Sequence, residues 1–111
     1  MAIVIVDPTL PLQVTVDFQS KHRAGFRLFT HGPDANDSWV FLKEGTEDTT
    51  TVAAPLAPGS GVKYEFVYFQ ESAPFRAVIV FRQNGQVLTG GLVAVDAPGN
   101  ALFITDSVTL Q

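Results

Sequence analysis

The feature that most constrains the fold of this chain is a period-two alternation of apolar and polar residues. Leu12, Val14, Val16 and Phe18 alternate with polar side chains in one short segment, and similar segments recur along the chain. Because successive side chains of a β-strand point to opposite faces, this spacing is typical of a strand with one buried and one exposed face. No window of eleven residues has apolar residues at helical spacing, so we expect an all-β protein.

Nine segments predict strands, near residues 2–6, 12–18, 25–30, 39–43, 49–54, 62–69, 75–83, 86–95 and 101–110. Segments rich in Pro, Gly, Asn and Asp separate them. The pair Asn84-Gly85 predicts a type I′ turn and a hairpin, because Asn and Gly adopt the positive φ angles of that turn at low cost. The pair Gly90-Gly91 predicts a bulge or a close approach of another backbone segment.

Short strands that alternate with turns are typical of a β-sandwich or a small closed barrel. We favour an antiparallel β-sandwich, immunoglobulin-like or jelly-roll-like, with about eight or nine short strands, and a small closed β-barrel is the alternative. The 111 residues match the size of one domain, and no internal linker is long enough to divide them. We therefore expect a single domain over residues 1–111.

The composition restricts the partners of the chain. Hydrophobic residues make up 46% of the sequence and charged residues 16%, below the ~25% typical of soluble domains, so part of the apolar surface is expected either to stay exposed or to meet a partner. The net charge of -4 disfavours nucleic acid, whose binding needs several Lys or Arg contacts with phosphates. The chain has no cysteine, which excludes disulfides and thiolate catalysis.

The first apolar segment, residues 2–6, predicts an ordinary strand. It is too short to cross a membrane, and no positively charged residues precede it as they would in a signal peptide. We therefore expect no membrane span. Because the chain begins at Met1 without a visible signal peptide, it is expected to be cytoplasmic.

Two neighbouring strands are apolar on both faces. Val67 and Phe69 extend the second face of one strand, and Val78 and Val80 do the same in the next. Such strands are covered on both sides or lie in an interface. A second layer or a loop would cover these four side chains in one interpretation. In the other, which we favour, they form the interface of a homodimer or larger homo-oligomer.

The richest polar segment is residues 31–38, which leads directly into the only tryptophan, Trp39. The oxygens of Asp34, Asn36 and Asp37 could ligate a hard cation such as calcium, although the spacing is not that of an EF-hand. The alternative is a turn in which these side chains cap their own backbone, as Asp and Asn commonly do. We favour the turn and expect no cofactor.

Aromatic rings beside polar side chains are the groups that commonly hold a sugar, because a ring covers its C–H face while polar atoms bind its hydroxyls. This chemistry makes a candidate ligand-binding site of seven residues: His31, Asp34, Asn36, Asp37, Trp39, Tyr64 and Tyr68. The competing interpretation, which we favour for Trp39, is a core tryptophan packed between two sheets.

Few side chains are available for catalysis. His31 with Asp34 and Asp37 is the strongest candidate for a small hydrolase-type centre, but no nucleophile stands in a G-x-S-x-G context. His22 lies between Lys21 and Arg23 and is expected to be exposed to solvent. We therefore assign no catalytic residue and expect a non-catalytic protein.

Three functions are compatible with these residues. The first is a non-catalytic binding or recognition module, lectin-like in using loops at one end of the sandwich to bind a glycan or another small ligand. The second is a structural or assembly subunit that associates with itself through its doubly apolar strands. The third is a small hydrolase-type enzyme centred on His31.

Overall fold

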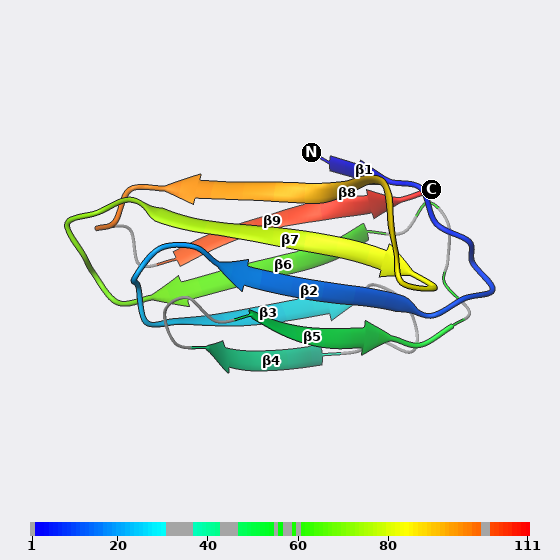
Figure 1. Ribbon diagram of the computed structural model, residues 1–111, viewed down its shortest axis with the longest axis horizontal. Helices are drawn as coiled ribbons and strands as arrows, with labels where there is room; N and C mark the ends of the chain where they lie inside the picture. The colour runs from blue at the N-terminus through cyan, green and yellow to red at the C-terminus, as the bar shows by residue number, and fades with distance from the viewer. Residues whose placement is uncertain are drawn as a thin grey trace.

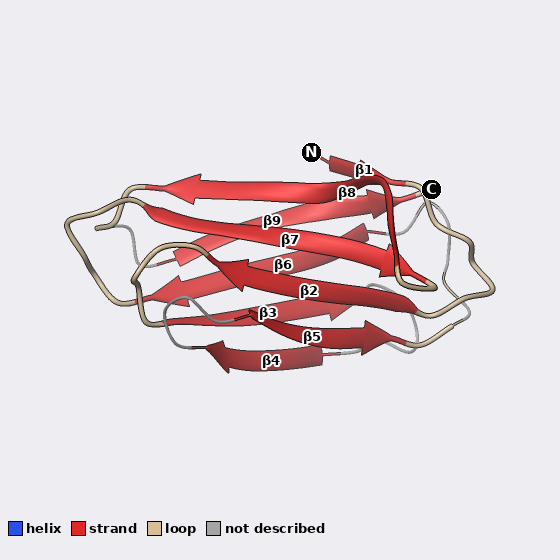
Figure 2. Ribbon diagram, viewed as in Figure 1, coloured by secondary structure: helices blue, strands red, loops and turns tan. Residues whose placement is uncertain are grey.

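The computed structural model describes residues 2–30, 37–42, 47–54, 56, 59, 61–100 and 103–111, and for residues 30, 37–42, 48 and 61 it describes the backbone alone. Nine strands lie within these residues: β1 (Ala2–Val4), β2 (Leu12–Phe18), β3 (Ala24–Thr30), β4 (Asp37–Leu42), β5 (Glu47–Val52), β6 (Gly61–Tyr68), β7 (Phe75–Gln83), β8 (Gln86–Ala97) and β9 (Phe103–Leu110). The described part of the chain contains no helix (Figure 2).

The strands form two sheets that lie one behind the other (Figure 1). One sheet has the order β1-β9-β6-β3-β4, and the other has the order β5-β2-β7-β8. All pairings are antiparallel except that of β1 with β9, which is parallel. The predicted β-sandwich is confirmed, and neither sheet closes into a barrel over the described strands. No described segment is a helix that could span a membrane.

Most connections between the described strands cross from one sheet to the other, unlike those of an immunoglobulin domain. Among the described strands, only β3–β4 and β7–β8 are consecutive strands of one sheet, and each other pair of consecutive strands lies in opposite sheets. An immunoglobulin sandwich places more of its consecutive strands side by side, as in its A–B, D–E and F–G pairs. Frequent crossing brings residues that are distant in sequence together at both ends of the sandwich.

The core lies between the sheets and consists mainly of the apolar faces that the alternation predicts. In β2, Leu12, Val14, Val16 and Phe18 are all at most 3% exposed. Aromatic rings fill the centre, and Phe66 packs edge-on against Phe18 with ring centroids 5.7 Å apart. Burial of such side chains contributes roughly 1.5–3 kcal/mol each before conformational entropy is subtracted.

The hairpin between β7 and β8 turns at the predicted Asn84-Gly85 pair. Asn84 has a φ of 51° and Gly85 a φ of 75°, so both central residues lie in the left-handed region. The type I′ turn requires this conformation, and its twist matches that of the flanking strands. The prediction of this hairpin is therefore confirmed.

A bulge in β8 connects the two sheets along one side of the sandwich. Residues 88–91 stand opposite the single residue Phe81 of β7, since the pairing moves from Val80–Leu92 to Arg82–Val87. The bulge brings Gly90 against β1, where a Cβ atom would overlap the carbonyl oxygen of Ile3. Both predicted roles of the glycine pair, a bulge and a close backbone approach, are thus confirmed.

A buried glutamine fixes the connection between β1 and β2. Gln83 is 5% exposed, and its Oε1 accepts a hydrogen bond of 2.8 Å from the Asp7 N–H. Its Nε2 donates to the carbonyl oxygens of Asp7 at 2.8 Å and Leu10 at 3.2 Å. One side chain at the end of β7 therefore satisfies three backbone groups that no ladder pairs.

Candidate functional site

The polar segment that the sequence predicts as a site lies mostly outside the described residues. His31, Asp34 and Asn36 are among the residues that the structure does not describe, so the sugar site, the calcium site and the hydrolytic centre built on them stay predictions. Asp37 begins β4 and pairs with Phe29, and only its backbone is described. Across the described residues, no group of three or more His, Cys, Asp or Glu side chains is placed to hold a metal.

The register of β4 locates Trp39 relative to the core. Trp39 pairs with Arg27 of β3, which in turn pairs with Glu65 of β6. Directly paired residues of antiparallel strands share one face of a sheet. Arg27 and Glu65 are only half-buried, whereas their neighbours Leu28 and Phe66 belong to the core. The backbone position of Trp39 is thus in an outward-facing row, not in a core row.

Tyr64 and Tyr68 lie on the opposite, inner face of the same sheet. They are 4% and 2% exposed and belong to the core. The Tyr68 hydroxyl donates a hydrogen bond of 3.0 Å to the carbonyl oxygen of Pro98, and its ring stacks on Phe75 with centroids 4.2 Å apart. The structure therefore does not bring these two tyrosines to the row of Trp39.

The electrostatics of the two phenols follow from this burial. Burial raises the pKa of Tyr64 above its ordinary value of 10.0, and the nearby Asp106 carboxylate raises it further. Burial alone raises the pKa of Tyr68. In both cases the neutral phenol is favoured because an apolar environment solvates a phenolate poorly.

The four predicted interface residues divide between the two sheets. Val67 and Phe69 are on the outer face of the five-stranded sheet and are 39% and 63% exposed. Val78 and Val80 belong to β7 of the other sheet, where Val78 is half-buried and Val80 is 8% exposed. The structure brings Val67 and Phe69 together but separates them from Val78 and Val80 by the thickness of the sandwich. The four residues do not form one surface.

A residue that the sequence analysis did not select completes the exposed part. Phe103 of β9 pairs directly with Val67 and is 52% exposed. Phe69 lies two residues beyond Val67, and its N–H donates to the Arg23 carbonyl oxygen at 3.0 Å. We call Val67, Phe69 and Phe103 the apolar outer patch. In the sequence, Phe103 is a large aromatic residue at the start of the segment 103–110, in which half of the residues are polar, and this contrast is the signal that could have indicated it.

Charged residues of both signs lie beside the apolar outer patch on the same face. The Arg27 guanidinium is 4.1 Å from the ring centroid of Phe29, and the Lys63 ammonium is 5.7 Å from the same ring. Glu65 pairs with Arg27 in the ladder between β6 and β3. The outer face of the five-stranded sheet thus has an apolar end and an adjoining band of two cations and one carboxylate.

His22 is buried, and the expectation that it is exposed is wrong. It is 1% exposed, and its ring meets those of Tyr68 and Phe75 edge-on at centroid distances of 5.2 Å and 5.5 Å. Its Nδ1 is 2.8 Å from the Ser20 hydroxyl, while the buried Nε2 has no hydrogen-bond partner within the described structure. The flanking cations Lys21 and Arg23 are exposed, so sequence neighbours do not indicate the environment of the imidazole.

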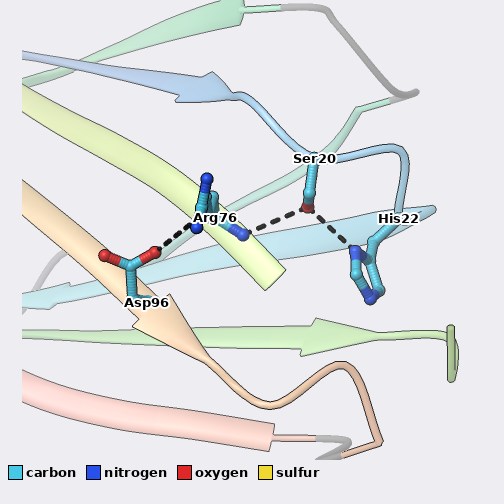
Figure 3. Close-up of polar contacts among 4 residues, drawn as sticks. All are labelled: Ser20, His22, Arg76 and Asp96. Atoms are coloured by element: carbon cyan, nitrogen blue, oxygen red, sulfur yellow. Dashed lines mark hydrogen bonds and ion pairs between the residues drawn. The ribbon is translucent and has the colours of Figure 1, made fainter. Parts of the chain in front are cut away.

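Ser20 links His22, in the β2–β3 connection, to β7 (Figure 3). The Ser20 hydroxyl oxygen accepts a hydrogen bond of 3.1 Å from the Arg76 N–H, which leaves the hydroxyl proton available for Nδ1 of His22. The Arg76 side chain meanwhile pairs with Asp96 at 3.1 Å, where both side chains are well exposed. Ser20 therefore binds both the imidazole of His22 and the backbone of Arg76 in β7.

Among the described residues, we take the apolar outer patch as the candidate functional site. Comparison with models of protein families, with curated proteins and with solved structures found no match to this chain.

Proposed function

We propose that this protein is a non-catalytic association module that pairs with a second copy of itself through the outer face of the five-stranded sheet. The observation that carries the proposal is the apolar outer patch, in which two exposed phenylalanines adjoin an exposed valine. Exposed rings lose no hydrogen bonds when they are covered, so their burial in an interface is favourable.

The size of the face supports a stable interface. From their exposed fractions, Val67, Phe69 and Phe103 present about 300 Å² of apolar surface, similar to the largest patch of a typical monomer. The molecule measures 42 × 26 × 22 Å, and the sheets lie across the two longer dimensions (Figure 1). A face of this area can supply the ~800 Å² that each partner of a standard interface buries, with the patch as its apolar centre.

The charges beside the patch favour a second copy over an unrelated partner. Arg27 and Lys63 carry positive charge, and Glu65, in the same region of the face, carries negative charge. In a two-fold interface the same surface meets itself, so a region with both signs can place each carboxylate near a cation of the partner. The scarcity of charged residues in the chain as a whole is in line with an apolar surface that is covered.

The double variant Val67→Ser, Phe69→Ser tests the proposal by sedimentation velocity over a concentration series. The parent chain is expected to form a dimer, and the double variant is expected to sediment as a monomer. The matched control is Val87→Ser, Leu92→Ser, which removes two exposed apolar residues from β8 of the other sheet, where they are 46% and 66% exposed. A parent chain that stays monomeric, or a patch variant that still dimerises, would overturn the proposal.

Carbohydrate binding is a second candidate, and the position of Trp39 favours it. The outward-facing row of Arg27 and Glu65 continues into Trp39 by backbone pairing. An aromatic residue whose backbone is in register with charged residues is a combination that suits a sugar ring. A glycan array with the parent chain, repeated with Trp39→Ala, tests this candidate. Glycan binding that disappears in a folded Trp39→Ala variant would support it, and absence of binding across the array would count against it.

A further inference from the structure

The outer edge of β9 is only partly covered by β1. The short strand β1 pairs with β9 through Ala2–Val108, Ile3–Thr109 and Val4–Leu110. On its other side, β9 pairs with β6 from Phe103 to Thr109. Over the described residues, positions 103–107 of β9 therefore have a neighbouring strand on one side only. We call positions 103–107 the open half of β9.

The hydrogen bonds to β1 show which backbone groups of the open half point outward. The Gln111 N–H donates to the Val4 carbonyl oxygen at 2.9 Å, and the Gln111 carbonyl oxygen accepts from the Val6 N–H at 2.8 Å. Alternate residues of a strand direct their backbone groups to the same side. By this alternation, Phe103, Thr105 and Ser107 direct their N–H and carbonyl groups away from β6. An exposed row of such groups can pair with another strand.

The Asp106 side chain binds one of these outward-pointing N–H groups, that of Ser107. Its Oδ1 accepts a hydrogen bond of 2.8 Å from the Ser107 N–H. Because the carboxylate is tied to the adjacent backbone, this N–H is not available to an incoming strand. Asp106 is itself exposed, which allows water to solvate the remaining carboxylate oxygen.

The position of Asp106 is unusual for a charged residue. In the register, Asp106 pairs with Tyr64, which pairs with Leu28, and both partners are in the core. Asp106 thus belongs to an inner row of the sheet, but at its edge. The carboxylate contributes to the raised pKa of Tyr64, as expected for a negative charge on the tyrosine side of the sheet. The next inner residue of β9, Ile104, is half-buried and packs against the core.

We propose that Asp106 prevents the open half of β9 from pairing with the same strand of a second copy. An antiparallel pairing about a two-fold axis at Thr105 would place each Ser107 N–H opposite the Phe103 carbonyl oxygen of the partner copy. It would also place the carboxylate of Asp106 opposite Ile104 of the other copy. The pairing would therefore have to break the Ser107 bond and put a charge beside an aliphatic side chain. Inward-pointing charges on edge strands are a recognised protection against such association.

The variant Asp106→Val tests this inference, because valine frees the Ser107 N–H and supplies a β-branched partner for Ile104. The measurement is the dissociation constant from sedimentation equilibrium, made in the Val67→Ser, Phe69→Ser background so that two of the three residues of the apolar outer patch are removed. We expect Asp106→Val to tighten self-association about tenfold or more relative to that background. Unchanged association in a folded Asp106→Val protein would overturn the inference. The inference is independent of the proposed function, because Phe103, the one patch residue that remains, is the same in the background and in the variant.

Two further variants locate the association at the edge. Thr105→Val makes an adjacent exposed residue apolar without freeing the Ser107 N–H, and it is expected to leave association unchanged. Adding Thr105→Pro to Asp106→Val removes an outward N–H at the centre of the two-fold pairing and is expected to abolish the gain. Association that survives the proline would show that another surface is responsible and would overturn the inference. If Asp106→Val does not fold by circular dichroism, Asp106→Thr tests the same change with a smaller side chain.

Discussion

The imidazole of His22 and the hydroxyl of Ser20 are 2.8 Å apart, two residues from each other in sequence, and together they join the β2–β3 connection to the aromatic core. The ring packs against Tyr68 of β6 and Phe75 of β7. The Ser20 hydroxyl oxygen in turn accepts a hydrogen bond from the Arg76 N–H near the start of β7. This end of the sandwich is thus fastened by one polar side chain and one buried ring.

Replacement of Ser20 by alanine is expected to destabilise the fold by about 1–3 kcal/mol, because it leaves Nδ1 of buried His22 without a partner. Urea unfolding monitored by tryptophan fluorescence measures the change. Lys21→Ala, at the exposed neighbouring position, is the control and should change stability by no more than about 0.5 kcal/mol. Equal stability of the two variants would contradict the structural role of the His22–Ser20 pair.

Two glycines with the same φ angle allow the effect of backbone strain to be separated from that of steric overlap. Gly85 and Gly90 both have a φ of 75°, but a Cβ at Gly85 meets no atom within 4 Å, whereas one at Gly90 overlaps the Ile3 carbonyl oxygen. We expect Gly85→Ala to cost about 1–2 kcal/mol from backbone strain. Gly90→Ala should cost about 1–3 kcal/mol more, because it also displaces β1. Thermal or urea unfolding of both variants gives the difference, and equal losses would show that contact with β1 is unimportant.

Gln83→Leu keeps the side-chain volume but removes the hydrogen bonds to Asp7 and Leu10. We expect a loss of about 2–4 kcal/mol in the free energy of unfolding, because more than one backbone group is left unpaired. Gln86→Leu, at an exposed position in the same hairpin, is the matched control. Amide exchange provides a second measurement, in which the Asp7 N–H should lose protection only in Gln83→Leu. Retained protection would contradict the role of Gln83.

The raised pKa values of Tyr64 and Tyr68 predict a loss of stability at alkaline pH. A phenol whose pKa is higher in the folded state binds its proton more tightly there, so its contribution is complete below the unfolded value of about 10 and is lost as the pH rises through the folded value. Urea midpoints measured between about pH 8 and pH 12 should fall more steeply in the parent chain than in Tyr64→Phe, Tyr68→Phe. Parallel curves would contradict the prediction.

The positions of the strands follow closely from local sequence, since period-two alternation and turn residues act over a few neighbours. The segment 12–18 was predicted with its observed bounds, and the Asn84-Gly85 turn was identified from its backbone requirement alone. The alternation also separates Tyr64 and Tyr68 from Val67 and Phe69, because the two sets lie on opposite faces of β6 and of the residue that follows it.

The candidate site was less predictable because it depends on contacts between distant segments. Nothing in the local sequence places Val67 and Val80 in different sheets, since that depends on which connections cross the sandwich. The flanking Lys21 and Arg23 suggested an exposed His22, but rings of β6 and β7 bury it. The parallel pairing of β1 with β9 joins the first and last strands and has no local signal.

That parallel pairing also determines how the molecule responds to mechanical tension. If Ala2 and Gln111 are pulled apart, the parallel neighbours β1 and β9 slide along each other in opposite directions, so the bonds between them are loaded together and not one after another. On the side away from β9, the bulge of β8 binds the residue that follows β1. The Ile5 N–H donates a hydrogen bond of 3.1 Å to the Thr89 carbonyl oxygen. The sandwich should therefore resist stretching in shear, and rupture of this short ladder should set the force at which the fold extends.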